Sequence, residues 1–323
     1  MARSGSPGSI TVLGECVADI FQNPAQSGPD GLSLRAMPGG GPANTAVALA
    51  RLGTPTRFLG RFSNDVFGTL FRTRLHASGV DLTGSVTACE PSTLAVADLD
   101  AAGQAAYTFY ADGAADWQWT DRELAEASKS DAVCLHTGSL ALIRHPGGSR
   151  IEDYLAQARE HATVSIDPNV RPLLVPPSAY RDRLTRWCAV ADILRLSEDD
   201  CALLAPGASL EEACDTWHAA GTHLVVITLG GRGALVSLDG LRVTVPAPPV
   251  VVVDTVGAGD AFTAGLLHRL EALGHLGSRL DEIALEDVTD ACTFAAHVAA
   301  LTCSVPGANP PWADESALRI STE

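Results

Sequence analysis

Two glycine-rich segments, far apart in the chain, combine a flexible turn with polar side chains at the start of an expected helix. They are Gly39-Gly40-Gly41-Pro42-Ala43-Asn44 and Asp254-Thr255-Val256-Gly257-Ala258-Gly259-Asp260. Glycine lets a backbone approach a ligand closely, and the first turn of a helix has unpaired N–H groups with partial positive charge. Both segments therefore have the composition of ligand-binding turns.

The second segment has the groups that phosphoryl transfer needs. The apolar run 250–253 predicts a buried strand before it, and residues 261–270 predict a helix after it. The turn amides can hold a phosphoryl group, and Asp260 can take the proton of an attacking hydroxyl. The alternative is that Asp260 only caps the helix, because Asp is a common N-cap residue. The segment is neither a GxxxxGK[ST] loop nor a GxGxxG dinucleotide motif.

The first segment can position a hydroxyl-bearing ligand. Pro42 suits the first helical turn, where its missing N–H costs nothing. Asn44 follows in the same turn and offers both a donor and an acceptor, which a sugar hydroxyl can use together. Taken alone, the segment is also explained by an ordinary turn between a strand and a helix.

Composition limits the class of protein. The chain has 323 residues, of which 46% are hydrophobic and 19% charged, enough for a large buried core. Its formal charge of −16 argues against nucleic acid as a partner. The eight cysteines are scattered without a CxxC pair, which predicts reduced, packed thiols. Because the first nine residues lack an apolar core and no apolar run reaches the ~20 residues of a membrane span, we expect a cytoplasmic protein without a membrane partner.

Short apolar runs alternate with helical patterns along most of the chain. This rhythm predicts an α/β fold with a mostly parallel sheet and helices on both faces. The expected strands are 10–13, Thr56–Leu59, 132–135, 163–166, 192–196 and 223–229, and the expected helices are 43–51, Val66–Ala77, 151–160, 180–190 and 210–220.

Two stretches interrupt the alternation. Residues 17–37 contain short β-like pieces around a Gly/Pro turn, and Thr93–Leu99 with Ala105–Tyr110 form a hairpin pattern. We therefore expect a small extra sheet over one edge of the main sheet, formed by about residues 15–38 and 90–113.

With both segments present in this order, the chain resembles the ribokinase-like (PfkB) family of carbohydrate kinases over roughly residues 10–312. Other segments match the family in order: Gly14-Glu15 with Asp19; Asp65 with Phe67-Gly68; Asp167-Pro168-Asn169-Val170-Arg171-Pro172; Leu196-Ser197-Glu198-Asp199-Asp200; Thr228-Leu229-Gly230-Gly231-Arg232-Gly233; and Pro306-Gly307-Ala308. The resemblance implies one three-layer α/β/α kinase domain over residues 1–323, in which the two interruptions form a β lid.

The resemblance also implies site residues and cofactors. Asp260 would be the catalytic base, and Gly257, Ala258 and Gly259 would form an anion hole. The sugar would bind to Asp19, Gly40, Gly41, Asn44 and Arg171, and ATP to Ser197, Thr228, Gly230 and Gly233. Asp200 would help to hold Mg²⁺ through water, although Ser197 and Asp200 depart from the family's Asn-x-x-Glu pattern. Many relatives bind K⁺, for which Asp254 and the backbone near Gly307 are the candidates here.

The expected acceptor is a simple sugar, and fructose is the first choice. The 39–44 turn and the 167–172 motif resemble fructokinases and 2-keto-3-deoxygluconate kinases more than ribokinase. That branch often has Arg after the second lid strand, where this chain has Ala111. Since a sugar acid needs a cation for its carboxylate, its absence favours a neutral sugar, although Arg171 could still partner an acid.

The same residues are compatible with other activities, and the lid bears on the oligomeric state. Ribokinase and 2-keto-3-deoxygluconate kinase are the main alternatives; a nucleoside kinase and a non-catalytic sugar-binding regulator fit less well. The lid also bears on assembly, because an exposed β edge invites pairing, and a homodimer through the lid is expected.

Overall fold

The computed structural model describes residues 8–23, 26–99, 105–127 and 131–314. Its main sheet has eight strands in the order β14-β13-β12-β11-β10-β9-β1-β4. These are β1 (Ser9–Leu13), β4 (Thr56–Leu59), β9 (Ala132–Gly138), β10 (Thr163–Asp167), β11 (Ile193–Ser197), β12 (Leu224–Thr228), β13 (Ala234–Leu238) and β14 (Leu241–Val245). The run from β12 to β4 is parallel, and β13 and β14 add an antiparallel edge.

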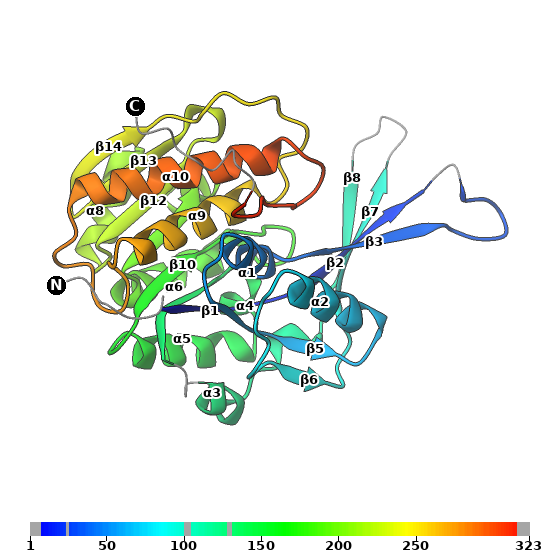
Figure 1. Cartoon of the computed structure of the whole chain (residues 1–323). Helices are drawn as coiled ribbons and strands as arrows, with labels where there is room; N and C mark the ends of the chain where they lie inside the picture. The colour runs from blue at the N-terminus through cyan, green and yellow to red at the C-terminus, as the bar shows by residue number, and fades with distance from the viewer. Residues whose placement is uncertain (1–7, 24–25, 100–104, 128–130, 315–323) are drawn as a thin grey trace.

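Helices cover both faces of this sheet and make three layers (Figure 1). One layer contains α1 (Gly41–Arg51), α2 (Val66–Ala77), α9 (Ala258–Ala272) and α10 (Leu285–Cys303). The other contains α3 (Asp121–Ala127), α4 (Ser139–Ile143), α5 (Gly147–Ala158), α6 (Pro177–Val190), α7 (Glu198–Leu204) and α8 (Leu210–Ala219). The structure thus has the α/β architecture that the alternating pattern predicts.

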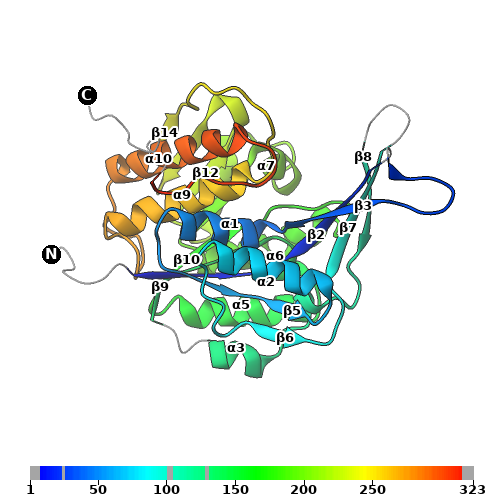
Figure 2. The same cartoon turned by 45° about the vertical axis from the view of Figure 1, so that its right-hand side comes forward.

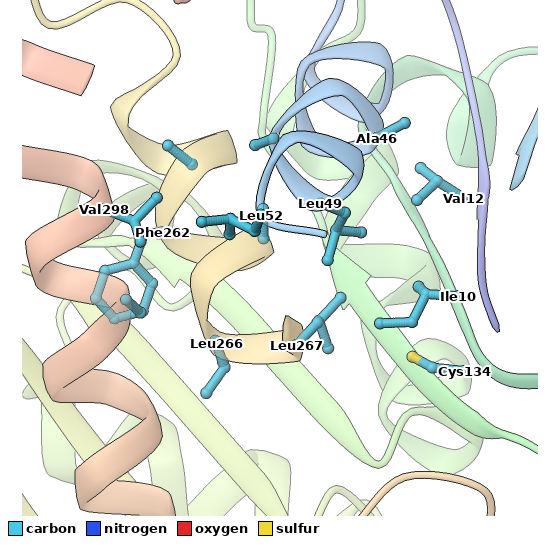
Figure 3. Close-up of a cluster of buried hydrophobic side chains, with 14 of the residues drawn as sticks. Ile10, Val12, Ala46, Leu49, Leu52, Cys134, Phe262, Leu266, Leu267 and Val298 are labelled. Carbon is cyan, nitrogen blue, oxygen red and sulfur yellow. The ribbon is translucent and has the colours of Figure 1, made fainter. Parts of the chain in front are cut away.

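Each face of the sheet has its own hydrophobic core, because side chains alternate along a strand. On β12, Leu224 and Val226 join the core under α1, α9 and α10, whereas Val225 and Ile227 join the core of the opposite layer. In the first core, Leu49 of α1 and Leu267 of α9 lie close to the strands (Figure 3). This packing holds the starts of α1 and α9 against one edge of the sheet.

A separate four-stranded sheet, called the lid here, projects from the body of the molecule (Figures 1 and 2). Its order is β3-β2-β7-β8, with β2 (Val17–Gln22), β3 (Leu34–Gly39), β7 (Thr93–Leu99) and β8 (Ala105–Tyr110). The extra sheet expected from the two interruptions is therefore present. The short pair β5 (Arg61–Ser63) and β6 (Val86–Ala88) lies beside α2 in the body.

Two carboxylates hold the base of the lid. Asp116, which is 3% exposed, accepts hydrogen bonds from the backbone N–H of Cys16 and the hydroxyl of Thr93, just where β2 and β7 begin. Asp65 caps α2 through the N–H of Gly68 and also accepts from the N–H of Ser92. The lid strands therefore leave the body from fixed positions.

One expected strand is wrong. Residues 250–253 form no strand, and the side chains of Val251, Val252 and Val253 are 83%, 60% and 58% exposed. The backbone N–H of Val253 donates instead to the carbonyl of Cys303 at the end of α10. β14, not this segment, forms the edge of the main sheet, so an apolar run without a neighbouring strand stays a loop.

Within the described ranges, none of the helices has the length and apolar character required to cross a membrane.

Candidate active site

The second glycine segment forms the start of α9. Gly257 is the N-cap residue and adopts a left-handed conformation, with φ 78°. A Cβ on Gly257 would lie 2.6 Å from the Cβ of Ala308, so only glycine fits there. No side chain caps this helix start, and the N–H groups of its first turn are therefore available to a ligand.

Asp260 and Asn44 meet at this helix start. The Asn44 side chain donates a hydrogen bond from Nδ2 to Oδ2 of Asp260 at 2.9 Å, and Asn44 is 8% exposed. Gly41 also lies against them, because a Cβ there would stand 3.2 Å from Oδ1 of Asp260 and 2.7 Å from Nδ2 of Asn169. The two glycine segments thus form one site.

The pKa of Asp260 suits a proton acceptor. Burial and the charge of Asp167 raise it to about 7, against the hydrogen bond from Asn44 and the charges of Arg171 and Arg195, which lower it. A carboxylate with a pKa near neutrality can take a proton from a hydroxyl more readily than an ordinary Asp. Asp260 does not cap α9, because Gly257 is the N-cap residue and no side chain caps the helix; its carboxylate accepts a hydrogen bond from Asn44 instead.

Asp19 lies on β2 at the base of the lid, beside the first glycine segment. A Cβ on Gly39 would stand 2.3 Å from Oδ2 of Asp19, and Gly40 has φ 104° against the carbonyl of Glu15. Burial raises the pKa of Asp19 to about 6, and the positive charge of Arg171 opposes this increase. Arg171 is exposed, and its charge lowers the pKa of Asp260 as well.

Ser197 and Asp200 form the capping box of α7. Oδ2 of Asp200 accepts from the Ser197 hydroxyl at 2.6 Å, and Oδ1 accepts from the N–H of Val170 at 2.9 Å. Asp200 is 7% exposed. Its carboxylate therefore joins the 197–200 segment to the 167–172 motif, which the sequence comparison with the Asn-x-x-Glu pattern did not predict.

Thr228 ends β12, and Gly230 and Gly233 follow in the next turn, both with positive φ. A Cβ on Gly233 would lie 1.9 Å from the carbonyl oxygen of Val245, so a side chain is excluded there. The hydroxyl of Thr228 accepts a hydrogen bond from Arg195 at 2.7 Å. Arg195 was not among the expected site residues.

Asp254 joins two loops beside the start of α9. Its carboxylate accepts from the N–H of Val256 at 3.0 Å and from the N–H of Gly307 at 2.8 Å. These two hydrogen bonds lower the pKa of Asp254. The carboxylate and the loop around Gly307 therefore lie together, as the expected cation site requires.

The site lies at the carboxyl ends of the parallel strands. β9, β10, β11 and β12 end there at Gly138, Asp167, Ser197 and Thr228. An open helix start, a carboxylate of raised pKa and a second acid on the lid suit a phosphotransferase.

Comparison with known proteins agrees with that class. A family model described as pfkB family carbohydrate kinase matches residues 8–315, so the chain belongs to this family. It is an ATP-dependent carbohydrate kinase. The fructokinase of Rhizobium leguminosarum bv. trifolii is 36% identical over 286 residues, 87% of this chain and 86% of that protein.

Solved structures lead to the same family. The fructokinase of Xylella fastidiosa with bound ATP has a TM-score of 0.85 at 28% identity, covering 93% of each chain. The fructokinase of Vibrio cholerae O395 with fructose, ADP and calcium ion has a TM-score of 0.79 at 30% identity, covering 97% of this chain and 96% of that one. A double mutant of it with fructose, ADP and potassium ion has a TM-score of 0.78 at 30% identity, covering 98% and 96%.

Proposed function

We propose that this protein is a fructokinase, which transfers the γ-phosphate of ATP to a hydroxyl of fructose. The observation that carries the proposal is the contact between Asn44 and Asp260 at the uncapped start of α9. This contact brings three groups together: Asn44 for a sugar hydroxyl, Asp260 as the base, and the backbone N–H donors of the first turn of α9. The names of the relatives support fructose as the acceptor.

In this mechanism Asp260 removes the proton of the attacking hydroxyl. The N–H groups of Gly257, Ala258 and Gly259 then bind the oxygens of the transferred phosphoryl group as their charge develops. Sugar hydroxyls bind to Asn44 and Asp19, and Gly40 and Gly41 let the sugar approach the backbone. Asn44 also fixes the Asp260 carboxylate, so that its free oxygen is directed to the acceptor.

On the nucleotide side, the proposed ATP contacts are Ser197, Thr228, Gly230 and Gly233. Mg²⁺ would neutralise the charge of the phosphates, with Asp200 reaching it through water. Within the described residues no three acidic, His or Cys side chains gather as a metal site. Asp200 is the single carboxylate proposed here, and Mg²⁺ usually keeps several waters and takes few protein ligands beside the substrate phosphates.

A monovalent cation is a further proposal. Asp254 supplies a carboxylate next to the Gly307 loop, and a relative has been crystallised with potassium ion. Its expected effect is to hold the 254–260 turn in place. Comparing kcat in KCl with kcat in tetramethylammonium chloride at equal ionic strength tests this; equal values would exclude activation by K⁺.

The surroundings of Ala111 support a neutral sugar. Ala111 is 4% exposed, and its carbonyl accepts from the indole of Trp117 at 2.6 Å. By the resemblance, relatives with acidic substrates would have a cation at this position, and Ala111 supplies no charge there. Arg171 is exposed and its charge lowers the pKa of both Asp19 and Asp260, so 2-keto-3-deoxygluconate stays in the set of acceptors to test.

A coupled assay of ADP release with a panel of acceptors tests the proposed function. The panel contains fructose, ribose, 2-keto-3-deoxygluconate and a nucleoside, each compared by kcat/KM. We expect fructose to have the highest value by at least about tenfold, which corresponds to roughly 1.4 kcal/mol of transition-state discrimination. A higher value for ribose or the sugar acid would replace fructose, and no ADP release with any acceptor would favour a non-catalytic role.

We also propose a homodimer through the lid. On the face opposite to Asp19, Ile20 is buried in the main core, and Ala36 and Val96 beside it in the register are partly buried against the same core. Leu34 and Tyr110, on the same face, are 53% and 61% exposed. An apolar sheet face at the rim of a projecting element is suited to a second copy of the chain. Light scattering should give twice the monomer mass, and Leu34→Arg, at an exposed position of this face, should give the monomer mass.

A further inference from the structure

Arg195 lies directly beneath the glycine turn of α9. It belongs to β11 and is 6% exposed. A Cβ on Gly259 would stand 2.9 Å and 3.0 Å from its two terminal nitrogens. Its guanidinium carbon lies 5.8 Å from the ring centroid of Phe262. The side chain is therefore packed against the same turn whose outer face offers N–H groups to a phosphoryl group.

The guanidinium connects Asp167 at the end of β10 with Thr228 at the end of β12. It donates to Oδ2 of Asp167 at 2.8 Å and to the hydroxyl of Thr228 at 2.7 Å, whereas its Nε finds no acceptor among the residues that the structure describes. A buried charge is costly unless it is paired and fully hydrogen-bonded. Apolar side chains in place of both Arg195 and Asp167 would avoid this cost, so the presence of the pair calls for a role.

We propose that Arg195 is a positioning residue for the phosphates of ATP. It orients the Thr228 hydroxyl toward them and places a fixed positive charge beneath residues 257–259. This role rests on the proposed phosphoryl transfer from ATP and is independent of which sugar is the acceptor.

The Thr228 hydroxyl becomes a directed donor because of this contact. Its oxygen accepts from Arg195, so its own proton is free for another acceptor. Among the described residues that proton meets only the carbonyl of Leu196, at 3.4 Å, which is a weak hydrogen bond. A phosphate oxygen beyond the end of β12 would be a stronger acceptor, because hydrogen bonds to charged groups are shorter and stronger.

The charge of Arg195 also reaches the proposed base. The polar groups that face the Asp260 carboxylate from the surrounding elements are Asn44, Asp167, Arg171, Arg195 and His136. His136 is neutral at physiological pH, because burial and Arg195 lower its pKa to about 3. Arg195 lowers the pKa of Asp260, so removing its charge raises that pKa.

The decisive variants are Arg195→Gln and Arg195→Lys, measured with ATP and the best acceptor of the panel. Arg195→Gln should raise the KM for ATP and lower kcat by about tenfold or more, while the KM for the sugar stays within about twofold. It should also shift the acid limb of the kcat profile to higher pH. Arg195→Lys keeps the charge but cannot reach both partners, so it should restore the acid limb and leave the KM for ATP raised.

A double-mutant cycle with Thr228→Val tests the route through the hydroxyl. In the parent protein, Thr228→Val should lower kcat/KM for ATP by about tenfold, the loss expected for one hydrogen bond to a charged group. In the Arg195→Gln background the same change should cost less than about twofold. Equal losses in both backgrounds would exclude the route through Thr228.

Arg61 provides a matched control. It is another buried arginine, 7% exposed, paired with Glu90 and Glu123, neither of which is a proposed ATP contact. Arg61→Gln should lower the melting temperature without changing the KM for ATP or the acid limb. If Arg195→Gln behaves in the same way, Arg195 has only a structural role and the proposal is overturned.

A second variant separates a loss of stability from a loss of ATP binding, because Arg195→Gln alone leaves Asp167 buried without its partner. Asp167→Asn combined with Arg195→Gln removes both charges and keeps the shape of the pair. This double variant should fold and still show the raised KM for ATP; a normal KM would overturn the proposal. A change of preferred sugar would alter only the proposed function, since every readout here concerns ATP or the acid limb.

Discussion

The side-chain amide of Asn44 donates a hydrogen bond to the carboxylate of Asp260 at 2.9 Å, across 216 positions of the chain. The contact depends on the packing of α1 against α9, which share one core with Leu49 and Leu267. It gives Asn44 two tasks, because the same side chain can bind a sugar hydroxyl and fix the proposed base.

Replacing Asn44 by Ala tests this double task. The hydrogen bond from Asn44 lowers the pKa of Asp260, so its loss should raise that pKa and move the acid limb of kcat/KM to higher pH. The KM for the sugar should increase as well, by about tenfold if one hydrogen bond to the sugar is lost. An unchanged acid limb, measured by initial rates across pH, would show that the contact does not act on the base.

The parent protein should itself lose activity in mildly acidic solution. As a base, Asp260 must be ionised, and its pKa is raised from 3.8 to about 7. The value of kcat/KM should therefore be level above this pH and fall about tenfold per unit below it. An acid limb near pH 4, measured with a coupling system that is not limiting, would contradict the raised pKa.

Gly41→Ala should abolish activity while the protein stays folded. The added Cβ would stand 2.7 Å from Asn169 and 3.2 Å from Asp260, in the space where the sugar is proposed to approach. We expect kcat/KM to fall by at least about 10²-fold, since small displacements of a reacting group are costly. Gly28→Ala is the control, because a Cβ at Gly28 meets nothing within 4 Å; equal losses in the two variants would refute the steric explanation.

Asp65→Ala should lower both stability and sugar binding. The carboxylate caps α2 and also holds Ser92 at the base of β7. Loss of an N-cap costs about 1 kcal/mol, and the additional hydrogen bonds to Ser92 bring the expected total to roughly 2 kcal/mol. Ser209→Ala, which removes the cap of α8 far from the lid, should lower stability by about half as much and leave the KM for the sugar unchanged. Urea unfolding and initial rates measure the two effects.

Much of the fold follows from local patterns in the sequence. The bounds expected for α2, β4, β7 and β8 are those of the structure, because each of these segments has a clear period and ends at turn residues. The run 250–253 shows the limit of such reasoning. Apolar composition favours burial, but a strand also needs a neighbouring strand with free backbone groups. Here the carbonyl of Cys303 accepts the N–H of Val253 instead.

The site was predictable where a motif marks it and hidden where only packing does. Asp260, Asn44 and the glycines stand in recognisable segments. Arg195 is one residue within the apolar run of β11, with no turn or glycine beside it. Its importance comes from Asp167, Thr228 and Gly259, which approach it only in the folded chain. The contact of Asp200 with the N–H of Val170 was missed for the same reason.

The most direct test of the account is the rate of fructose phosphorylation by Asp260→Asn. This change keeps the size of the side chain but removes its ability to accept a proton. We expect kcat to fall by at least about 10²-fold, with little change in the KM for ATP or in melting temperature. Asp182→Asn, on the exposed side of α6, should retain the parent kcat. A near-normal kcat for Asp260→Asn would contradict the role of Asp260 as the base.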